Sequence, residues 1–378
     1  MPRIAVISWI FLSVCCLSPS ATAAFSSIYI FGDSVSSTTT NNATGSQTNW
    51  YYGKRYNNGR TWVEVLAQRQ GLGANSLTTN TWNYSSNNLS FYGQWSSLLT
   101  TNVAKFTAPA NATNCLFVVW VCDADFVGDV FNYLGGPNLG PPSGTNMSDW
   151  TTAINQHLTN HFKAITNLYA KGMRVLVAPN AVDINWIPQL NANTPGYKNF
   201  VRQRIMAFNT NYLALMQQLE TLHPDLKIVV PDFFSDLDGA VTNAAAYGLT
   251  NVLNGGFTID AIESGFTNIS GSATNYVFWD PTSPSAKISE IFADTAQQAL
   301  SPAVFAGMVS TGFSNRIDMA SLPVGMNGTI LFATNLSQTI WPTNSTFSAT
   351  NVAQSVFVSP TNSARFYSLK FPWQWSWP

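Results

Sequence analysis

Four short apolar runs, separated by long stretches of mixed polarity, constrain the fold of this chain more than any other feature. The runs cover residues 27–31, 115–121, 175–178 and 227–230. Strands joined through long helices form crossover connections, which make the strands parallel in a sheet that is covered on both faces. The sequence therefore predicts an α/β fold with a parallel sheet.

Helical periodicity occupies the stretches between and after these runs. Apolar residues recur at steps of three and four in residues 61–70, 149–170, 200–222 and 285–300, a spacing that places them on one face of a helix. In the second helix this face consists of Trp150, Ile154, Leu158, Phe162, Ile165 and Leu168. Gly172 follows it, as is typical of a helix end.

The helical pattern stops near Ser301, and a different composition begins. From residue 303 onward Gly, Pro, Asn and Thr separate short β-type runs, such as residues 329–332 and 355–358. This pattern predicts a small all-β module at residues 303–378, after an α/β domain at residues 24–302.

The first 23 residues have the features of a signal peptide. Arg3 precedes an apolar stretch at residues 4–17, and Ala21-Thr22-Ala23 offers small residues for cleavage. The apolar stretch is short for a membrane span. We therefore expect a secreted or periplasmic protein whose mature chain begins near residue 24 and contains no transmembrane segment.

Two cysteines remain after that cleavage, Cys115 and Cys122, at the two ends of a predicted strand. Seven strand residues span roughly 23 Å, whereas a disulfide requires Cα atoms within about 7 Å of each other. We therefore expect two unpaired thiols. Only 9% of residues are charged, and no basic run occurs, which argues against a nucleic-acid partner.

The segment Phe31-Gly-Asp-Ser-Val-Ser36 is the first candidate for chemistry. Ser34 stands just past the end of a buried strand, and ligand sites of parallel sheets form at the carboxyl ends of strands. Gly32 permits a tight turn there. A serine at this place can also cap a helix N-terminus, so these residues alone leave both roles open.

Five segments together resemble the GDSL (SGNH) serine ester hydrolases. They are residues 31–36, 55–64 (Arg-Tyr-Asn-Asn-Gly-Arg-Thr-Trp-Val-Glu), 116–121, 246–248 and 276–280 (Tyr-Val-Phe-Trp-Asp), in the order that the family has. The resemblance covers residues 25–302. It implies a flavodoxin-like three-layer α/β/α sandwich with a parallel sheet (the SGNH hydrolase fold), no cofactor or metal, and Ser34 and Asp280 as catalytic residues.

Three positions depart from the family pattern. The family's last block reads Asp-x-x-His, but here Ser283 follows Asp280 at the position of the general base. The oxyanion Asn of the third block is replaced by Ala124, and Asn87 stands in the block that normally supplies a Gly amide. Loss of the catalytic His costs on the order of a millionfold in turnover, and loss of one oxyanion donor costs roughly a hundred- to a thousandfold.

Other residues could replace the missing base. His157 and His161 share one helix face, where we expect surface residues far from the functional edge. His223 precedes the strand at residues 227–230, so it is predicted at the amino end of that strand. None of the three histidines is therefore a favoured base.

Four aspartates are predicted at the functional edge: Asp33, Asp123, Asp125 and Asp280. Asp125 or Asp33 could act as an alternative acid or base, or the group could bind a cation such as calcium. We favour a third interpretation, in which Asp33 and Asp125 cap or brace loops.

An aromatic group at residues 50–56 (Trp50, Tyr51, Tyr52 and Tyr56) could hold a sugar or an acyl chain, or serve as a lid or as core. The sequence thus predicts an exported ester hydrolase for small-molecule, lipid or glycan acyl esters, with impaired or absent activity. The alternative is a non-catalytic glycan- or lipid-binding pseudoenzyme on the same fold.

Overall fold

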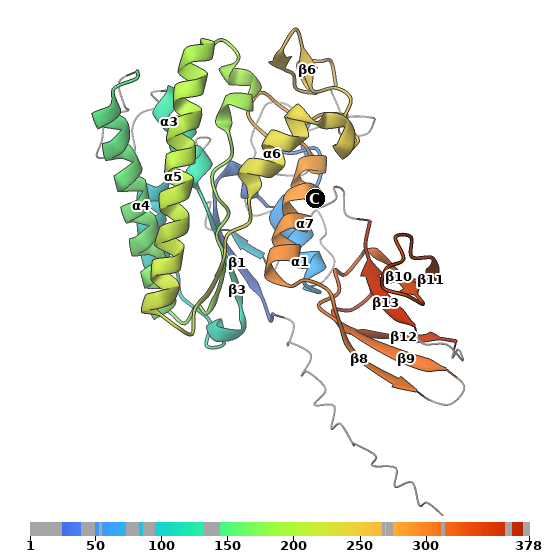
Figure 1. Cartoon of the computed structure of the whole chain (residues 1–378). Coiled ribbons are helices and arrows are strands. Elements are labelled where there is room, and N and C mark those ends of the chain that lie inside the picture. Colours follow the sequence, from blue (N-terminus) through green and yellow to red (C-terminus); the bar gives the residue numbers. More distant parts are fainter. Residues whose placement is uncertain are drawn as a thin grey trace, which may run out of the picture.

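A parallel sheet of five strands forms the centre of the larger part of the molecule (Figure 1). The computed structural model describes residues 25–38, 50–52, 55–72, 83–85, 95–131, 144–266, 269, 275–310, 314–359 and 365–372. The strands are β1 (Ile28–Gly32), β2 (Asn83–Ser85), β3 (Leu116–Trp120), β4 (Val175–Val177) and β5 (Lys227–Val229). Their order is β2-β1-β3-β4-β5, and every neighbouring pair is parallel. This arrangement confirms the predicted α/β fold.

Helices cover both faces of the sheet, as the parallel connections require. One group packs together through α2–α4 and α4–α5 contacts and the other through α1–α7 and α6–α7 contacts (Figure 1). The helices are α1 (Trp62–Arg69), α2 (Ser96–Lys105), α3 (Cys122–Phe131), α4 (Met147–Ala170), α5 (Pro195–Leu222), α6 (Phe233–Thr242) and α7 (Ala286–Leu300). The four helices and four strands predicted from periodicity are all present, with ends shifted by a few residues.

β3 is the most buried strand, because it lies in the middle of the sheet and both of its faces are covered. All five of its residues are buried. Cys115 and Cys122 flank this strand, and neither thiol forms a disulfide with any described residue. The prediction of two unpaired thiols is confirmed. Among the described helices, none is both long and apolar enough to cross a bilayer.

The described residues after α7 form β-strands joined by turns and loops. The strands are β8 (Val304–Ser310), β9 (Asn315–Ala320), β10 (Asn327–Ala333), β11 (Thr343–Ser348), β12 (Gln354–Val358) and β13 (Phe366–Lys370). They make two antiparallel three-stranded sheets, β11-β10-β13 and β12-β9-β8. The predicted C-terminal β-region is thus observed.

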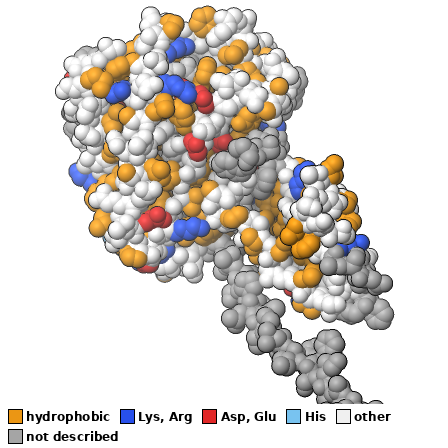
Figure 2. All heavy atoms as spheres, viewed as in Figure 1, with side chains coloured by type: hydrophobic (Ala, Val, Ile, Leu, Met, Phe, Trp, Pro, Cys, Tyr) orange, Lys and Arg blue, Asp and Glu red, His pale blue; other side chains and the backbone are white. Residues whose placement is uncertain are grey.

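This β-region has a small hydrophobic core of its own, centred on Ile317, Leu322 and Ile330. It meets the α/β part at the end of α1, where Val324 N donates to Arg69 O at 3.1 Å. Large apolar side chains are exposed on it, and orange atoms are numerous on the face seen in Figure 2. Among them are Val304, Met308, Val309, Phe357 and Ile340.

We propose that the boundary between two separable units lies between residues 302 and 303. A chain truncated after Pro302 is expected to unfold cooperatively. The β-region has its own core, so its removal takes from the α/β part few contacts other than those of Arg69 with Val324. Thermal unfolding followed by near-ultraviolet circular dichroism measures this. A broad, non-cooperative transition in the truncated chain would contradict the division.

Candidate active site

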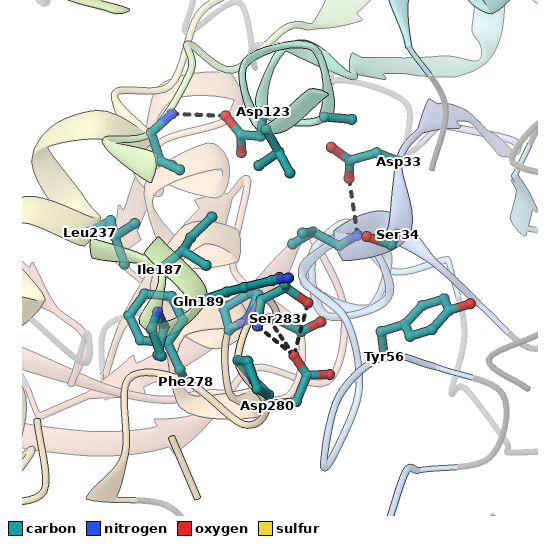
Figure 3. Close-up of a pocket in the computed structure, with 18 of the residues that line it drawn as sticks. Asp33, Ser34, Tyr56, Asp123, Ile187, Gln189, Leu237, Phe278, Asp280 and Ser283 are labelled. Carbon is teal, nitrogen blue, oxygen red and sulfur yellow. Dashed lines mark hydrogen bonds between the residues drawn. The ribbon is translucent and has the colours of Figure 1, made fainter. Parts of the chain in front are cut away.

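A cavity of about 560 Å³ opens at the carboxyl ends of the strands. Each neighbouring crossover contributes to its wall, as expected for a site in a parallel sheet. Ser34 follows β1, Ala124 follows β3, Val182 follows β4, and Leu237 lies in α6 after β5. The loop before α7 adds Asp280 and its neighbours up to Pro284. The structure thus brings Ser34, Asp33, Ala124, Asp280 and Ser283 to one cavity (Figure 3).

The turn that carries Ser34 is tightly built. Asp33 Oδ1 accepts from Val35 N at 3.0 Å and caps the short 3₁₀-helix Ser34–Ser36. A Cβ atom on Gly32 would lie 2.5 Å from Ser36 Cβ, so only glycine fits there. Because Asp33 is the cap, the alternative capping role for Ser34 is wrong. The Ser34 hydroxyl faces the cavity and makes no hydrogen bond to any residue that the structure describes.

Asp280 organises the loop at the opposite end of the cavity. Its Oδ1 accepts from Thr282 N at 2.8 Å, Thr282 Oγ1 at 3.1 Å and Ser283 N at 2.6 Å. Its Oδ2 accepts from the Tyr51 hydroxyl at 3.0 Å. Ser283 is 3% exposed and lines the cavity, and its hydroxyl has no hydrogen-bond partner in the described part of the chain. In the view of Figure 3, Ser34 lies between this loop and Asp33.

The aspartates after β1 and β3 divide into two sets. Asp33 and Asp123 line the cavity, whereas Asp125 lies outside it. Asp125 Oδ1 accepts from Ser96 N at 2.8 Å and so braces the start of α2. Asp33 thus caps the turn that carries Ser34, and Asp125 braces the start of α2. No three His, Cys, Asp or Glu side chains in the described ranges are grouped so that they could hold a metal ion.

Burial shapes the charge of these carboxyl groups. It raises the pKa of Asp33 to about 7, although the backbone N–H groups of Val35 and Ala124 oppose that rise. Burial, together with the negative charge of Asp33, raises the pKa of Asp123 well above the ordinary range. Burial also raises the pKa of Asp125 to about 6, with His157 acting in the opposite direction. Two buried carboxylates next to each other cannot both ionise easily.

The expectation that both α4 histidines lie at the surface is wrong. His161 is fully buried against Phe208 and Tyr212, and its Nδ1 lies 2.9 Å from His157 O. His157 is largely buried, with Nε2 3.0 Å from Asp129 Oδ2. The cause is that α4 packs on both α2 and α5, so its polar face is covered as well. None of the three histidines lines the cavity, and His223 stacks on Tyr169 with ring centroids 3.8 Å apart.

Two members of the aromatic group, Tyr51 and Tyr56, line the cavity, and their rings meet edge to face at 6.1 Å. Asn87 lies outside the described residues. The apolar part of the wall was not predicted, because it combines residues of loops and helix caps with single residues of β3, α3, α6 and α7 that only the tertiary structure brings together. It includes Trp95, Trp120, Val127, Val182, Ile187, Leu237, Phe278 and Phe292.

The buried His161 makes stability depend on pH. Burial lowers its pKa to about 4, whereas an unfolded His has a pKa of about 6.5. Between these values only the unfolded state takes up the proton, so the free energy of unfolding falls as pH decreases from about 6.5 to about 4. A pKa difference of one unit corresponds to about 1.4 kcal/mol, so protonation of His161 on unfolding lowers the free energy of unfolding by on the order of 3 kcal/mol across this pH range.

We expect His161→Phe to remove this fall in the free energy of unfolding at acid pH. Urea unfolding at a series of pH values measures it as the difference between the variant and the wild-type chain. The comparison cancels the opposite contribution of Asp33, whose raised pKa favours the folded state in acid. An unchanged pH slope in the variant would show that His161 takes up no proton on unfolding.

Comparisons with known proteins identify several relatives of one kind, the GDSL esterase/lipases. No model of a protein family matches the chain. One GDSL esterase/lipase of Arabidopsis thaliana is 28% identical over 193 residues, covering 49% of this chain and 48% of the relative. A second is 26% identical over 321 residues, covering 71% of this chain and 87% of the relative. The GDSL esterase/lipase APG of the same plant is 35% identical over 94 residues, covering 23% and 26%.

The chain spans about half the length of the first of these relatives and most of the second. The matches agree with the predicted resemblance, which rests on five segments in the family's order. They confirm the predicted resemblance of this chain to the GDSL esterase/lipases.

Proposed function

We propose that this protein is an exported ester hydrolase on a flavodoxin-like three-layer SGNH fold, with Ser34 as nucleophile and strongly reduced turnover. The main support is that Ser34, whose hydroxyl bonds to none of the described residues, lines the 560 Å³ cavity together with the Asp280–Ser283 loop. The apolar wall suits the acyl part of a small-molecule, lipid or glycan ester. Export rests on the signal-peptide features of residues 1–23.

In the proposed acylation step, Ser34 Oγ forms a bond to the ester carbonyl carbon, and its proton passes to a carboxylate. Asp33 lines the cavity, and its pKa of about 7 suits a base near neutral pH. The alcohol leaves with that proton, and water then hydrolyses the acyl–Ser34 ester through the same carboxylate. Turnover is slow because Asp33 is already held by Val35 N and because Asp280 has no histidine to orient.

A specific observation supports a second candidate, a non-catalytic lipid- or glycan-binding protein. The cavity is retained although no histidine lines it and Ala124 has no side-chain donor. A site that has lost turnover can still bind through its shape and its apolar wall.

Hydrolysis of p-nitrophenyl acetate by the mature chain and by Ser34→Ala tests the proposal. We expect slow wild-type hydrolysis that Ser34→Ala abolishes, and no change in Ser148→Ala, since Ser148 is an exposed residue of α4 outside the cavity. Equal rates in wild type and Ser34→Ala would exclude the serine mechanism. Binding on a lipid or glycan array by both chains would then support the second candidate.

A further inference from the structure

Asp123 occupies a distinctive place in the cavity wall. It lies in the first turn of α3, one residue before Ala124, where the family's oxyanion amide is missing. Its side chain is 6% exposed, and it lines the same cavity as Ser34. Figure 3 shows Asp123 and Asp33 at one end of the cavity, across Ser34 from Asp280 and Ser283.

The hydrogen bonds of Asp123 leave one oxygen available. Oδ1 accepts from Val182 N at 2.9 Å. Oδ2 has no hydrogen-bond partner among the residues that the structure describes. A carboxyl group with one oxygen accepting and the other protonated can donate a hydrogen bond, and a buried donor of this kind needs a partner.

The groups that face Asp123 keep it uncharged. They are Asp33 at the end of β1, Cys122 and Asp125 in α3, and the Val182 N–H after β4. Burial and the charge of Asp33 disfavour ionisation of Asp123, and one N–H group favours it. Asp33 has N–H groups from both Val35 and Ala124, so it ionises first. Of the two cavity aspartates, Asp33 accepts from two backbone N–H groups and Asp123 from one, so ionisation of the pair favours Asp33.

We propose that Asp123 is a catalytic carboxylic acid that donates a hydrogen bond from Oδ2 to the ester carbonyl oxygen and to the oxyanion formed from it. The inference rests on the proposed function and assigns to Asp123 the task of the amide that Ala124 lacks. Asp123 keeps its proton throughout the reaction, because the Ser34 proton passes to Asp33. Two carboxyl groups in one site thus have different roles that their surroundings set.

Two substitutions separate donation from every other role of the side chain. Asp123→Asn retains an acceptor for Val182 N and an N–H donor in place of the acid. Asp123→Leu has similar volume but no donor. We expect hydrolysis of p-nitrophenyl acetate to stay within about threefold of wild type in Asp123→Asn and to fall roughly a hundredfold in Asp123→Leu, as for loss of an oxyanion donor. Wild-type activity should also decline at alkaline pH, whereas that of Asp123→Asn should not.

The carbonyl stretch of a protonated carboxyl group gives a readout that does not depend on activity. The infrared difference spectrum between wild type and Asp123→Asn at pH 7 should contain this band, and its absence would overturn the inference. Equal losses in Asp123→Asn and Asp123→Leu would also overturn it, since they indicate a base, as would full activity in both. Ser34→Ala measured alongside separates the two proposals, because only failure of the serine mechanism leaves its rate unchanged.

Discussion

Ser283→His is expected to raise kcat on p-nitrophenyl acetate by roughly a hundredfold or more, since a positioned general base contributes about 10²–10⁴-fold. Ser283 lines the cavity, so we expect an imidazole at this position to extend into the cavity. Asp280, three residues earlier, is already held in place by the backbone N–H groups of Thr282 and Ser283. The variant thus restores the one group that converts Ser34 into an effective nucleophile.

The oxygens of Asp280 are already occupied, which limits how well it can orient the new histidine. Oδ2 accepts the Tyr51 hydroxyl at 3.0 Å. We therefore expect Tyr51→Phe to increase the gain from Ser283→His further, because it frees this oxygen for the imidazole. The same substitution in the wild-type chain should leave kcat nearly unchanged, which makes it a matched control.

Ala124→Asn alone should have a smaller effect, because an oxyanion donor stabilises little until the nucleophile is activated. Combined with Ser283→His, it should exceed the sum of the single effects, since catalytic groups that act together are non-additive. All gains should vanish in a Ser34→Ala background. A triple variant with Ser283→His, Ala124→Asn and Tyr51→Phe that stays as slow as wild type would argue against Ser34 as a latent nucleophile and would favour the binding protein.

The second large effect concerns stability. Replacing either Arg55 or Glu64 by alanine is expected to lower the free energy of unfolding by about 3–5 kcal/mol, the usual cost of leaving one buried charge unpaired. The two side chains are fully buried and form a two-pronged ion pair. Glu64 Oε2 also accepts from Thr61 N at 3.1 Å at the start of α1. One carboxylate thus joins α1 to the segment that carries Tyr51 and Tyr56.

Urea unfolding monitored by tryptophan fluorescence measures these losses. A partly exposed pair in the β-region, Arg316 and Asp318, with side chains 43% and 30% exposed, is the matched control. Arg316→Ala should cost less than about 1 kcal/mol, because solvent reaches and screens this pair. The double variant Arg55→Met and Glu64→Leu should lose less than the sum of the two alanine variants, since no unpaired charge remains. If Arg55→Ala and Glu64→Ala lower the free energy of unfolding as little as Arg316→Ala does, the buried ion pair does not stabilise this segment.

Much of the fold was predictable because its determinants are local. The apolar run 115–121 became the buried central strand β3, and the periodic stretch 149–170 became α4. Shorter elements such as α2 and α6 were missed, because ten residues with few periodic positions do not distinguish a helix from a loop. The β-region was recognisable from its turn residues, but the pairing of its strands into two sheets was not, because pairing depends on contacts distant in sequence.

The sequence by itself determined which residues reach the functional edge, because a residue just past a parallel strand must lie at that strand's carboxyl end. Ser34, Asp123 and Ala124 follow from this rule, whereas the serine in place of a histidine at position 283 was found through the resemblance to the family. Only the tertiary structure decided which of the two aspartates at the start of α3 lines the cavity. Residues of a helix turn by about 100° per position, so Asp123 lines the cavity while Asp125, two positions further along α3, contacts α2 and His157. That difference in direction places Asp123, and not Asp125, in the cavity wall together with Asp33.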